Sequence, residues 1–180
     1  MDYYKRANEL KEDTIEIRRY LHKNAEVGLD LPNTIEYVMK QLKEYGIQPQ
    51  LCGHGVTATI GKGKPVILLR AYMDDLPITE LSGEEFTCTS GNMHACGHDG
   101  IVASALVLAR ILAEEGEVFP VRMRFLFEPA EEIGEGAKRM LAAGALDGEP
   151  DIFLMFHYAV DQSFGMAVHE GQASAMILSL

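Results

Sequence analysis

The chain has 180 residues, of which 47% are hydrophobic and 24% charged, and its formal net charge is −11. The length and composition are those of one globular domain with a substantial core. The acidic balance argues against nucleic acid and against anionic membrane surfaces as partners. The longest run of apolar or small residues, 101–109, is too short to cross a bilayer, and the N-terminus is not a signal peptide. Three cysteines without paired spacing favour free thiols, so we expect a cytoplasmic protein.

The chain is predicted to begin with two amphipathic helices. The first spans residues 3–23, where helical spacing relates Ala7, Leu10, Thr14, Ile17 and Leu21. The second is predicted to start at Asn33, with Glu36 completing a capping box, and to stop at Gly46. Its apolar side is formed by Ile35, Val38, Met39 and Leu42.

Strand signals follow, and they then alternate with helices. Residues 56–60 and 66–70 flank a glycine-rich turn over 61–64, which is typical of a hairpin. The second of these strands begins with a continuous apolar run, as in a strand covered on both faces. Next we expect a helix over 99–115, a strand over 121–127, a helix over 135–143 and a strand over 151–156. The alternation predicts an α/β domain with a largely parallel, mixed sheet and flanking helices.

Ionisable residues stand at or just past the ends of three predicted strands. Asp74 and Asp75 follow the first of them, Glu131 and Glu132 the second, and His157 the third. In open α/β sheets the carboxyl ends of the strands form the edge where sites lie. We therefore expect Asp74, both glutamates and His157 to lie near one another. Asp75 is interpreted as a solvated neighbour.

The stretch Met93–Asp99 contains a thiol and two imidazoles within five residues. Cys96 and His98 are separated only by Gly97, so both can face one metal ion. Thiolate plus imidazole suits zinc, or a neighbouring ion such as cobalt, nickel or manganese. Amides at the start of a helix here would help to stabilise a Cys96 thiolate. The alternative is an ordinary helix start capped by Asp99, with an inert, buried cysteine.

Other interpretations of these residues stay open at this point. The glutamate pair alone would suit a solvated helix start, and His157 could be a core histidine. A thiol redox protein is disfavoured because no Cys-x-x-Cys is present. A cysteine hydrolase using Cys96 and His98 would leave the glutamates and His157 unexplained. Of the remaining candidates, we expect Cys52 and Cys88 to be inert. His22 is expected to be structural or packed near the site, and His94 to lie beside the ligands. His54 and His169 are expected to lie in loops or strands.

Two motifs resemble a known family. Met93–Asp99, together with Phe-Glu-Pro-Ala-Glu-Glu at 127–132, looks like the amidohydrolase branch of the co-catalytic metallopeptidases. That branch includes hippurate hydrolases, aminoacylases, N-acetyl-diaminopimelate deacetylases and plant auxin-conjugate hydrolases. The stretches 19–28, 69–77 and 137–157 support the likeness, which covers essentially all 180 residues.

The resemblance implies a phosphorylase/hydrolase-like zinc exopeptidase architecture and two divalent metal ions (zinc, manganese, cobalt or nickel). The implied reaction is hydrolysis of the amide bond of N-acyl amino acids or small peptides. Glu131 would be the general base, and Asp74 would orient a ligand. The implied metal ligands are Cys96, His98, Glu132 and His157.

Four positions depart from the family pattern. Tyr72 stands where the branch usually has Asp, Glu128 replaces a usual Gln, Ile101 a common His, and Ala25 a usual Pro. None of them is an implied ligand or the implied base. The departures therefore concern substrate preference and rate more than reaction class.

Family chains are longer than this one. They continue into a lid and dimerisation domain and then into a second catalytic segment that supplies one more histidine ligand. We therefore expect residues 1–180 to be the first segment of the catalytic domain, weak or inactive alone and prone to self-association through exposed apolar surface. The alternative is a truncated, non-catalytic metal-binding or interaction protein derived from the same fold. Retention of Glu131 favours the enzyme.

Overall fold

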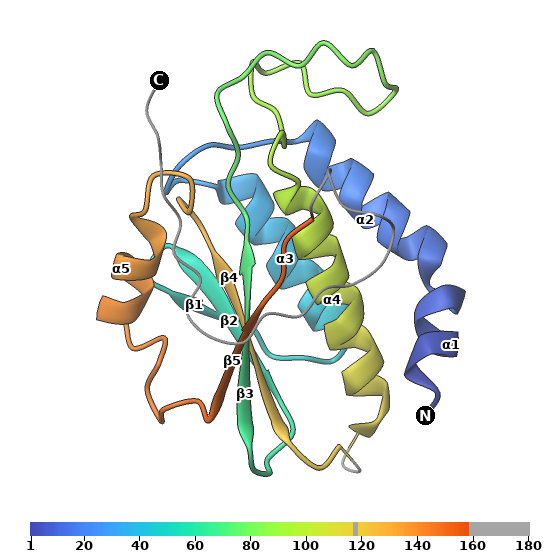
Figure 1. Cartoon of the computed structure of the whole chain (residues 1–180), viewed down its shortest axis with the longest axis vertical. Helices are drawn as coiled ribbons and strands as arrows, with labels where there is room; N and C mark the ends of the chain where they lie inside the picture. The colour runs from blue at the N-terminus through green and yellow to red at the C-terminus, as the bar shows by residue number, and fades with distance from the viewer. Residues whose placement is uncertain (117–118, 159–180) are drawn as a thin grey trace.

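The computed structural model describes residues 1–116 and 119–158, in which helices pack on both sides of one sheet (Figure 1). The helices are α1 (Tyr3–Glu9), α2 (Lys11–Lys23), α3 (Pro32–Glu44), α4 (His98–Glu114) and α5 (Gly136–Ala142). The strands are β1 (Gln50–Cys52), β2 (Gly55–Ile60), β3 (Val66–Tyr72), β4 (Arg122–Glu128) and β5 (Ile152–Met155), in the order β1-β2-β4-β3-β5. β3 runs parallel to β4 and to β5, whereas β2 is antiparallel to β1 and to β4. The predicted α/β class and mixed sheet are confirmed.

Two hydrophobic cores lie on opposite faces of this sheet. Successive residues of a strand point to opposite faces, and the burial follows that alternation. Leu69 and Phe125 belong to the larger core, beneath α3 and α4. Leu68 and Leu126 belong to the smaller core with Met140 of α5. None of the described helices is both long and apolar enough to cross a membrane.

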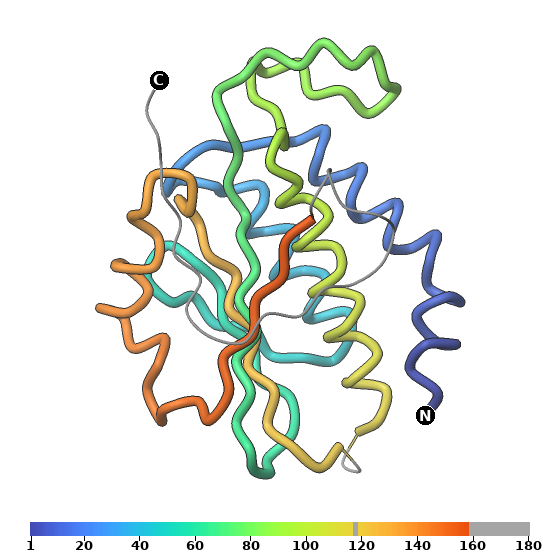
Figure 2. The backbone as a smooth tube through the Cα atoms, viewed as in Figure 1, coloured from blue at the N-terminus to red at the C-terminus, as the bar shows by residue number. Residues whose placement is uncertain are grey.

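The direction of the strand order reverses around β3, and this reversal determines where a site can form. The chain passes from β3 through α4 to β4, and then through α5, on the other face, to β5 on the far side of β3. Right-handed crossovers in opposite directions place their helices on opposite faces. The loops after β3 and β4 therefore diverge at the edge where ligands bind in such sheets. The connection over 73–97 extends beyond that edge, and the end of β5 comes close to the start of α4 (Figure 2).

The hairpin predicted around the turn 61–64 is wrong. β4 lies between β2 and β3, so the connection between those two strands has to span about 10 Å, twice the spacing of neighbouring strands. Its glycines permit close approach to the chain just before β4. A Cβ on Gly61 or Gly63 would lie 2.0 or 1.9 Å from a backbone carbonyl oxygen there. The glycines that indicated a tight turn are thus explained by packing.

A short hairpin occurs elsewhere, between β1 and β2. Cys52 pairs with Gly55 across a turn formed by Gly53 and His54. Gly53 has φ +59, which suits glycine at this position of a two-residue hairpin turn. β1 is too short to show a periodic pattern, and for that reason the sequence did not predict it. His54 is exposed in this turn, in agreement with its assignment to a loop or strand.

The first predicted helix is interrupted at Leu10, which separates α1 from α2 and turns into the core with 3% exposure. The break lets each helix contact α4 separately. Arg6 of α1 donates to Glu114 (Nε to Oε2, 2.7 Å), and Arg110 donates to Asp13 of α2 (Nη1 to Oδ2, 2.7 Å). Apolar spacing continues across the break, so the sequence pattern is that of one helix.

The N-terminus of α3 is capped from outside the helix. The carboxylate of Glu26 accepts the backbone N–H groups of Asn33 (3.2 Å) and Thr34 (2.8 Å). The predicted capping box of Asn33 with Glu36 is therefore wrong, and the helix begins one residue earlier than predicted. A loop carboxylate replaces the local cap, which satisfies the same N–H groups.

Candidate metal centre

Cys96 and His98 lie at the first turn of α4. Gly97, between them, has φ +87, a left-handed conformation that glycine adopts without strain. This conformation lets both neighbouring side chains face the same point. Their donor atoms and a ring nitrogen of His157 all lie within 4.8 Å of one another. His98 is fully buried, Cys96 half-buried and His157 exposed.

A second group of potential ligand atoms shares His98. One donor atom each from His98, Glu131 and Glu132 lie within 4.8 Å of one another. The His98 Nε2 atom is 3.8 Å from a carboxylate oxygen of each glutamate. The structure thus brings together all four residues predicted to bind metal and the residue predicted to act as base.

Backbone carbonyls orient both histidines of the cluster. Nδ1–H of His98 donates to the carbonyl of Asp74 (2.9 Å), and Nδ1–H of His157 donates to the carbonyl of Tyr158 (2.8 Å). Because a carbonyl oxygen only accepts, Nδ1 carries a proton in both rings, and in the neutral form of such a ring Nε2 carries the lone pair. The Nε2 atom of His98 is buried and has no hydrogen-bond partner among the described residues. This arrangement is typical of metal-binding imidazoles.

Asp74 holds the cluster together from the end of β3. Besides its backbone contact to His98, its carboxylate accepts the backbone N–H groups of Glu131 (2.8 Å) and Glu132 (3.2 Å). Burial raises the pKa of Asp74 to about 6, and the two amides oppose that rise. The sequence predicted that Asp74 orients one ligand, whereas here it contacts three of the predicted functional residues.

The two glutamates differ in environment. The Glu131 side chain is 31% exposed and the Glu132 side chain 19%, and the Oε1 atom of Glu132 is buried without a hydrogen-bond partner among the described residues. Burial, followed by the negative charge of Glu132, raises the pKa of Cys96 to about 11. In the metal-free protein, burial and the carboxylates thus outweigh any stabilisation of a thiolate by the helix start. A divalent cation would reverse this balance, because a coordinated thiol is deprotonated.

A buried ion pair beside the cluster escaped the sequence analysis. Arg70 binds Glu128 with two guanidinium nitrogens, one of them 3.1 Å from Oε1. The same guanidinium lies 4.5 Å from the ring centroid of Tyr72, whose ring is 5.0 Å from that of His98. A charged residue within an otherwise apolar strand was the available signal. Tyr72 and Glu128 are register partners across β3 and β4.

A second polar network anchors the connection between β3 and α4. The ring of His22 is buried, with Nδ1 2.8 Å from Asp99 Oδ2 and Nε2 3.1 Å from Glu80 Oε1. Arg18 also donates to Asp99 (2.9 Å). His22 therefore links α2, the start of α4 and the long connection, close to the cluster and outside it. Asp99 lies within the first turn of α4 and is not its N-cap, which is Gly97.

The interpretation of Asp75 as a solvated residue is wrong. Its exposure is 2%, and it contacts His94 Nδ1. Burial, reinforced by the charges of Asp99 and Asp74, raises the pKa of Asp75 to about 9. Burial also lowers the pKa of His94 to about 3. Both shifts favour the uncharged forms of the pair, which is not part of the ligand cluster.

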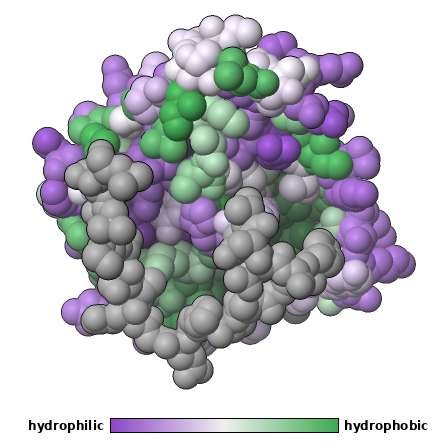
Figure 3. Space-filling view, turned by 45° about the horizontal axis from the view of Figure 1, so that its top comes forward, coloured by the Kyte–Doolittle hydropathy of each residue, from purple (hydrophilic) through white to green (hydrophobic). Residues whose placement is uncertain are grey.

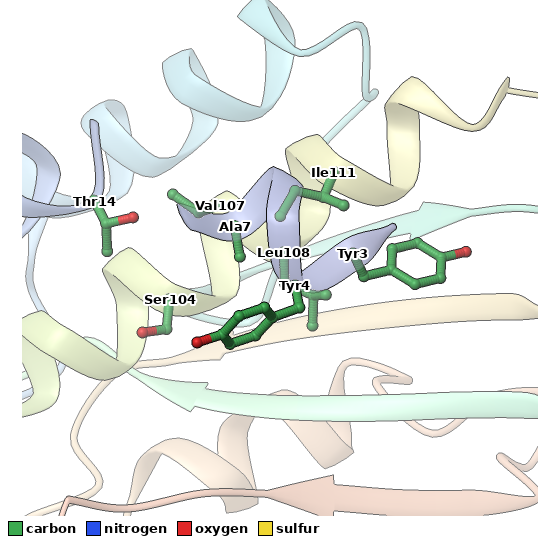
Figure 4. A pocket seen from close by; sticks show the side chains of 8 residues that line it. All are labelled: Tyr3, Tyr4, Ala7, Thr14, Ser104, Val107, Leu108 and Ile111. Atoms are coloured by element: carbon green, nitrogen blue, oxygen red, sulfur yellow. The ribbon is translucent and has the colours of Figure 1, made fainter. Parts of the chain in front are cut away.

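Among the described residues, the two other cysteines belong to neither group of potential ligand atoms. Cys52 and Cys88 are buried free thiols, and His169 lies outside the described residues. An apolar hollow of about 380 Å³ lies between α1 and α4, where Tyr4 and Ser104 line it (Figure 4). No residue of the cluster lines this hollow. The candidate site is therefore the cluster at the edge of the sheet.

The chain is similar to known proteins over the stretch that contains the cluster. Residues 68–175 match the model of Peptidase family M20/M25/M40. N-acetyl-L-cysteine deacetylase of Bacillus subtilis is 42% identical over 144 residues, which cover 77% of this chain and 35% of the relative. IAA-amino acid hydrolase ILR1-like 6 of Arabidopsis thaliana is 39% identical over 141 residues, which cover 76% of this chain and 30% of the relative.

A solved structure agrees with the fold. The YXEP protein of Bacillus subtilis, described as a dinuclear metal binding peptidase, is 34% identical with a TM-score of 0.80. The likeness covers 86% of this chain and 45% of that one. The chain thus spans less than half the length of each of these three relatives.

Proposed function

The chain belongs to peptidase family M20/M25/M40, and from this premise we propose that it forms the first catalytic segment of a metal-dependent amidohydrolase. The proposed reaction is hydrolysis of the amide bond of N-acyl amino acids or small peptides. One observation carries the proposal: two buried atoms without a hydrogen-bond partner in the described part of the chain, His98 Nε2 and Glu132 Oε1, lie in a cluster of further ligand groups. The names of the relatives, a deacetylase of N-acetyl-L-cysteine and a hydrolase of IAA-amino acids, support this substrate class.

We assign two divalent ions to the cluster. The mixed set of thiolate, imidazole and carboxylate donors suits zinc, manganese, cobalt or nickel. The unpartnered Nε2 and Oε1 atoms fit a cation, since buried polar atoms normally have partners. When bound, the ions would polarise the scissile carbonyl and acidify water. The proposed ligands are Cys96, His98, Glu132 and His157.

Glu131 is the proposed general base. Its carboxylate takes a proton from the attacking water and delivers it to the leaving amine. It is the more exposed member of the pair, so it can face a substrate, whereas the Oε1 atom of Glu132 is buried. Asp74 holds its backbone N–H at 2.8 Å and thereby fixes the direction in which the side chain starts.

The test uses a full-length form of the protein and separates the two glutamates by metal content and hydrolysis rate, measured side by side on N-acetyl amino acids. Glu131→Gln keeps the size of the side chain but removes the base, so the rate should fall roughly a hundredfold to ten-thousandfold. Its metal content should stay near that of the unmodified protein. Glu132→Gln should lose metal, because a neutral amide is a poor substitute for a carboxylate ligand, and excess metal should partly restore its rate. Cys96→Ser should behave like Glu132→Gln.

Three other outcomes would change or refute these assignments. If Glu131→Gln loses metal and Glu132→Gln loses only rate, the two roles are exchanged. If neither substitution changes metal content or rate, the pair is a solvated helix start and the proposal fails. Metal binding by a full-length form that has no measurable hydrolysis, even with a full metal complement, would favour the alternative of a non-catalytic metal-binding protein.

We also propose self-association of the isolated chain through β5. All four residues of this strand, Ile152, Phe153, Leu154 and Met155, are between 43% and 51% exposed. Exposed hydrophobic side chains are visible among hydrophilic ones on the face that Figure 3 shows. Exposed apolar side chains of this kind favour association. The free state of all three cysteines supports a cytoplasmic location, which we propose as well.

A further inference from the structure

His157 is the proposed ligand with the least support from its surroundings. It is exposed, and it follows β5, whose side chains are themselves about half exposed. Its Nε2 atom nevertheless lies 3.3 Å from Cys96 Sγ. Some contact beyond the strand has to hold the ring there, since an exposed chain segment gains little from packing.

Tyr158, the next residue, makes those contacts. Its backbone carbonyl accepts the Nδ1–H of His157 at 2.8 Å. Its hydroxyl donates to the carbonyl of Gly100 at 3.3 Å and lies 2.8 Å from Ser104 Oγ. Both of these partners belong to α4, beside which the end of β5 lies in Figure 2. Tyr158 therefore ties the segment that carries His157 to the helix that carries His98.

Glycine at two positions leaves room for this ring. A Cβ placed on Gly100 would lie 2.7 Å from Cε2 of Tyr158, closer than side chains pack. A Cβ on Gly97 would be in ordinary contact with the same ring, 3.8 Å from Cδ2. Gly100 has no requirement for a left-handed backbone, because it lies within the helix. Its lack of a side chain is explained by the ring of Tyr158.

We propose that Tyr158, seated over Gly100 of α4, is a positioning residue that places His157 against Cys96 for metal binding. The inference rests on the proposed function, because it assumes that His157 is a ligand. Tyr158 touches neither the metal nor the substrate in this proposal. It acts by holding the imidazole ready, so that less ordering is needed when a metal binds.

Metal affinity is the direct measure of such a role. Outer contacts that orient a ligating histidine typically contribute about tenfold to a hundredfold in affinity. Tyr158→Ala should weaken Co²⁺ binding by about that factor. Tyr158→Phe keeps the ring over Gly100 and loses only the hydroxyl contacts, so its loss should be smaller, about twofold to fivefold. Partial rescue by phenylalanine separates the packing of the ring from its hydrogen bonds.

The decisive variant is Gly100→Ala. Alanine is favoured over glycine within a helix, so this change should leave the unfolding midpoint equal or higher. The added methyl group should displace the Tyr158 ring and weaken Co²⁺ binding about as much as Tyr158→Ala. In the Tyr158→Ala background, Gly100→Ala should cause no further loss. A purely structural effect would instead move stability and affinity in the same direction.

The experiment is a Co²⁺ titration of the 180-residue chain, followed by visible absorbance and by the thiolate-to-cobalt charge-transfer band. Tyr4→Ala is the matched control, because Tyr4 lies near Ser104 in Figure 4 but makes no contact with His157, and its affinity should not change. His157→Ala should weaken binding at least as much as Tyr158→Ala.

Two results would overturn the inference in distinguishable ways. If His157→Ala weakens Co²⁺ binding while Tyr158→Ala and Gly100→Ala bind as tightly as the unmodified chain, the positioning role is refuted and the proposed metal centre stands. If neither His157→Ala nor Cys96→Ser weakens binding, the proposed metal centre itself fails, and the inference fails with it.

Discussion

Replacing Asp74 or Asp75 by asparagine should have very different consequences, although the two residues are adjacent and equally buried. The Asp74 carboxylate accepts two backbone N–H groups, from Glu131 and Glu132. Asparagine offers one carbonyl oxygen, so at least one of these bonds is lost. Asp75 pairs with the side chain of His94, and its raised pKa favours its uncharged form.

The expected magnitudes follow from these contacts. A hydrogen bond to a charged group contributes roughly 1.5 to 3 kcal/mol, so Asp74→Asn should lower the free energy of unfolding by about 2 to 3 kcal/mol. Co²⁺ affinity should also fall by about tenfold to a hundredfold, because Glu131 and Glu132 lose their common anchor. Asp75→Asn replaces a neutral acid by a neutral amide of the same shape, and it should change stability by less than about 1 kcal/mol.

Urea unfolding at pH 8, where Asp74 is ionised, measures the first quantity, and a Co²⁺ titration measures the second. Equal losses of stability in the two variants would refute the reasoning, because they would mean that Asp75 is charged or that the amide contacts of Asp74 are worth little. A stability loss in Asp74→Asn without any change in Co²⁺ affinity would refute the link between this anchor and the metal centre.

Four further expectations concern the surroundings of the site and the chain as a whole. Glu128→Gln should lower the free energy of unfolding by about 3 kcal/mol because it leaves Arg70 without its buried partner, and the double variant with Arg70→Met should lose less, both measured in urea. His22→Ala should leave Glu80 facing Asp99 without the intervening imidazole, so limited proteolysis should cut the connection between β3 and α4 faster. The isolated chain should hydrolyse N-acetyl amino acids with a turnover rate far below about ten per second. Phe153→Lys should reduce the self-association of the chain, as measured by sedimentation velocity.

The position of the site could be predicted because a rule of topology fixes it. Alternating strands and helices imply parallel strands with their carboxyl ends at one edge, and the residues just past those ends were visible in the sequence. Asp74, Glu131 and His157 therefore converge as expected. Which strands are neighbours in the sheet was harder to predict, because the glycines of the turn 61–64 suit both a hairpin and close packing.

Local sequence patterns could not predict which polar side chains are buried. Asp75 looks solvated in sequence because charged residues usually are, yet it is paired with His94 inside the protein. His22 is likewise held between carboxylates that stand 58 and 77 residues away in the chain. Such pairings depend on where the long connection folds back, which periodicity does not encode.

Two departures from the family pattern become one feature in the structure. Tyr72 and Glu128 are register partners, and Arg70 contacts both of them. Because the Tyr72 ring packs against His98, this ion pair shapes the surroundings of a proposed ligand while the ligand itself is retained. Changes of packing beside a ligand alter its orientation and basicity. We therefore expect the departures to affect rate and substrate preference, since the residues proposed to carry out the hydrolysis remain in place.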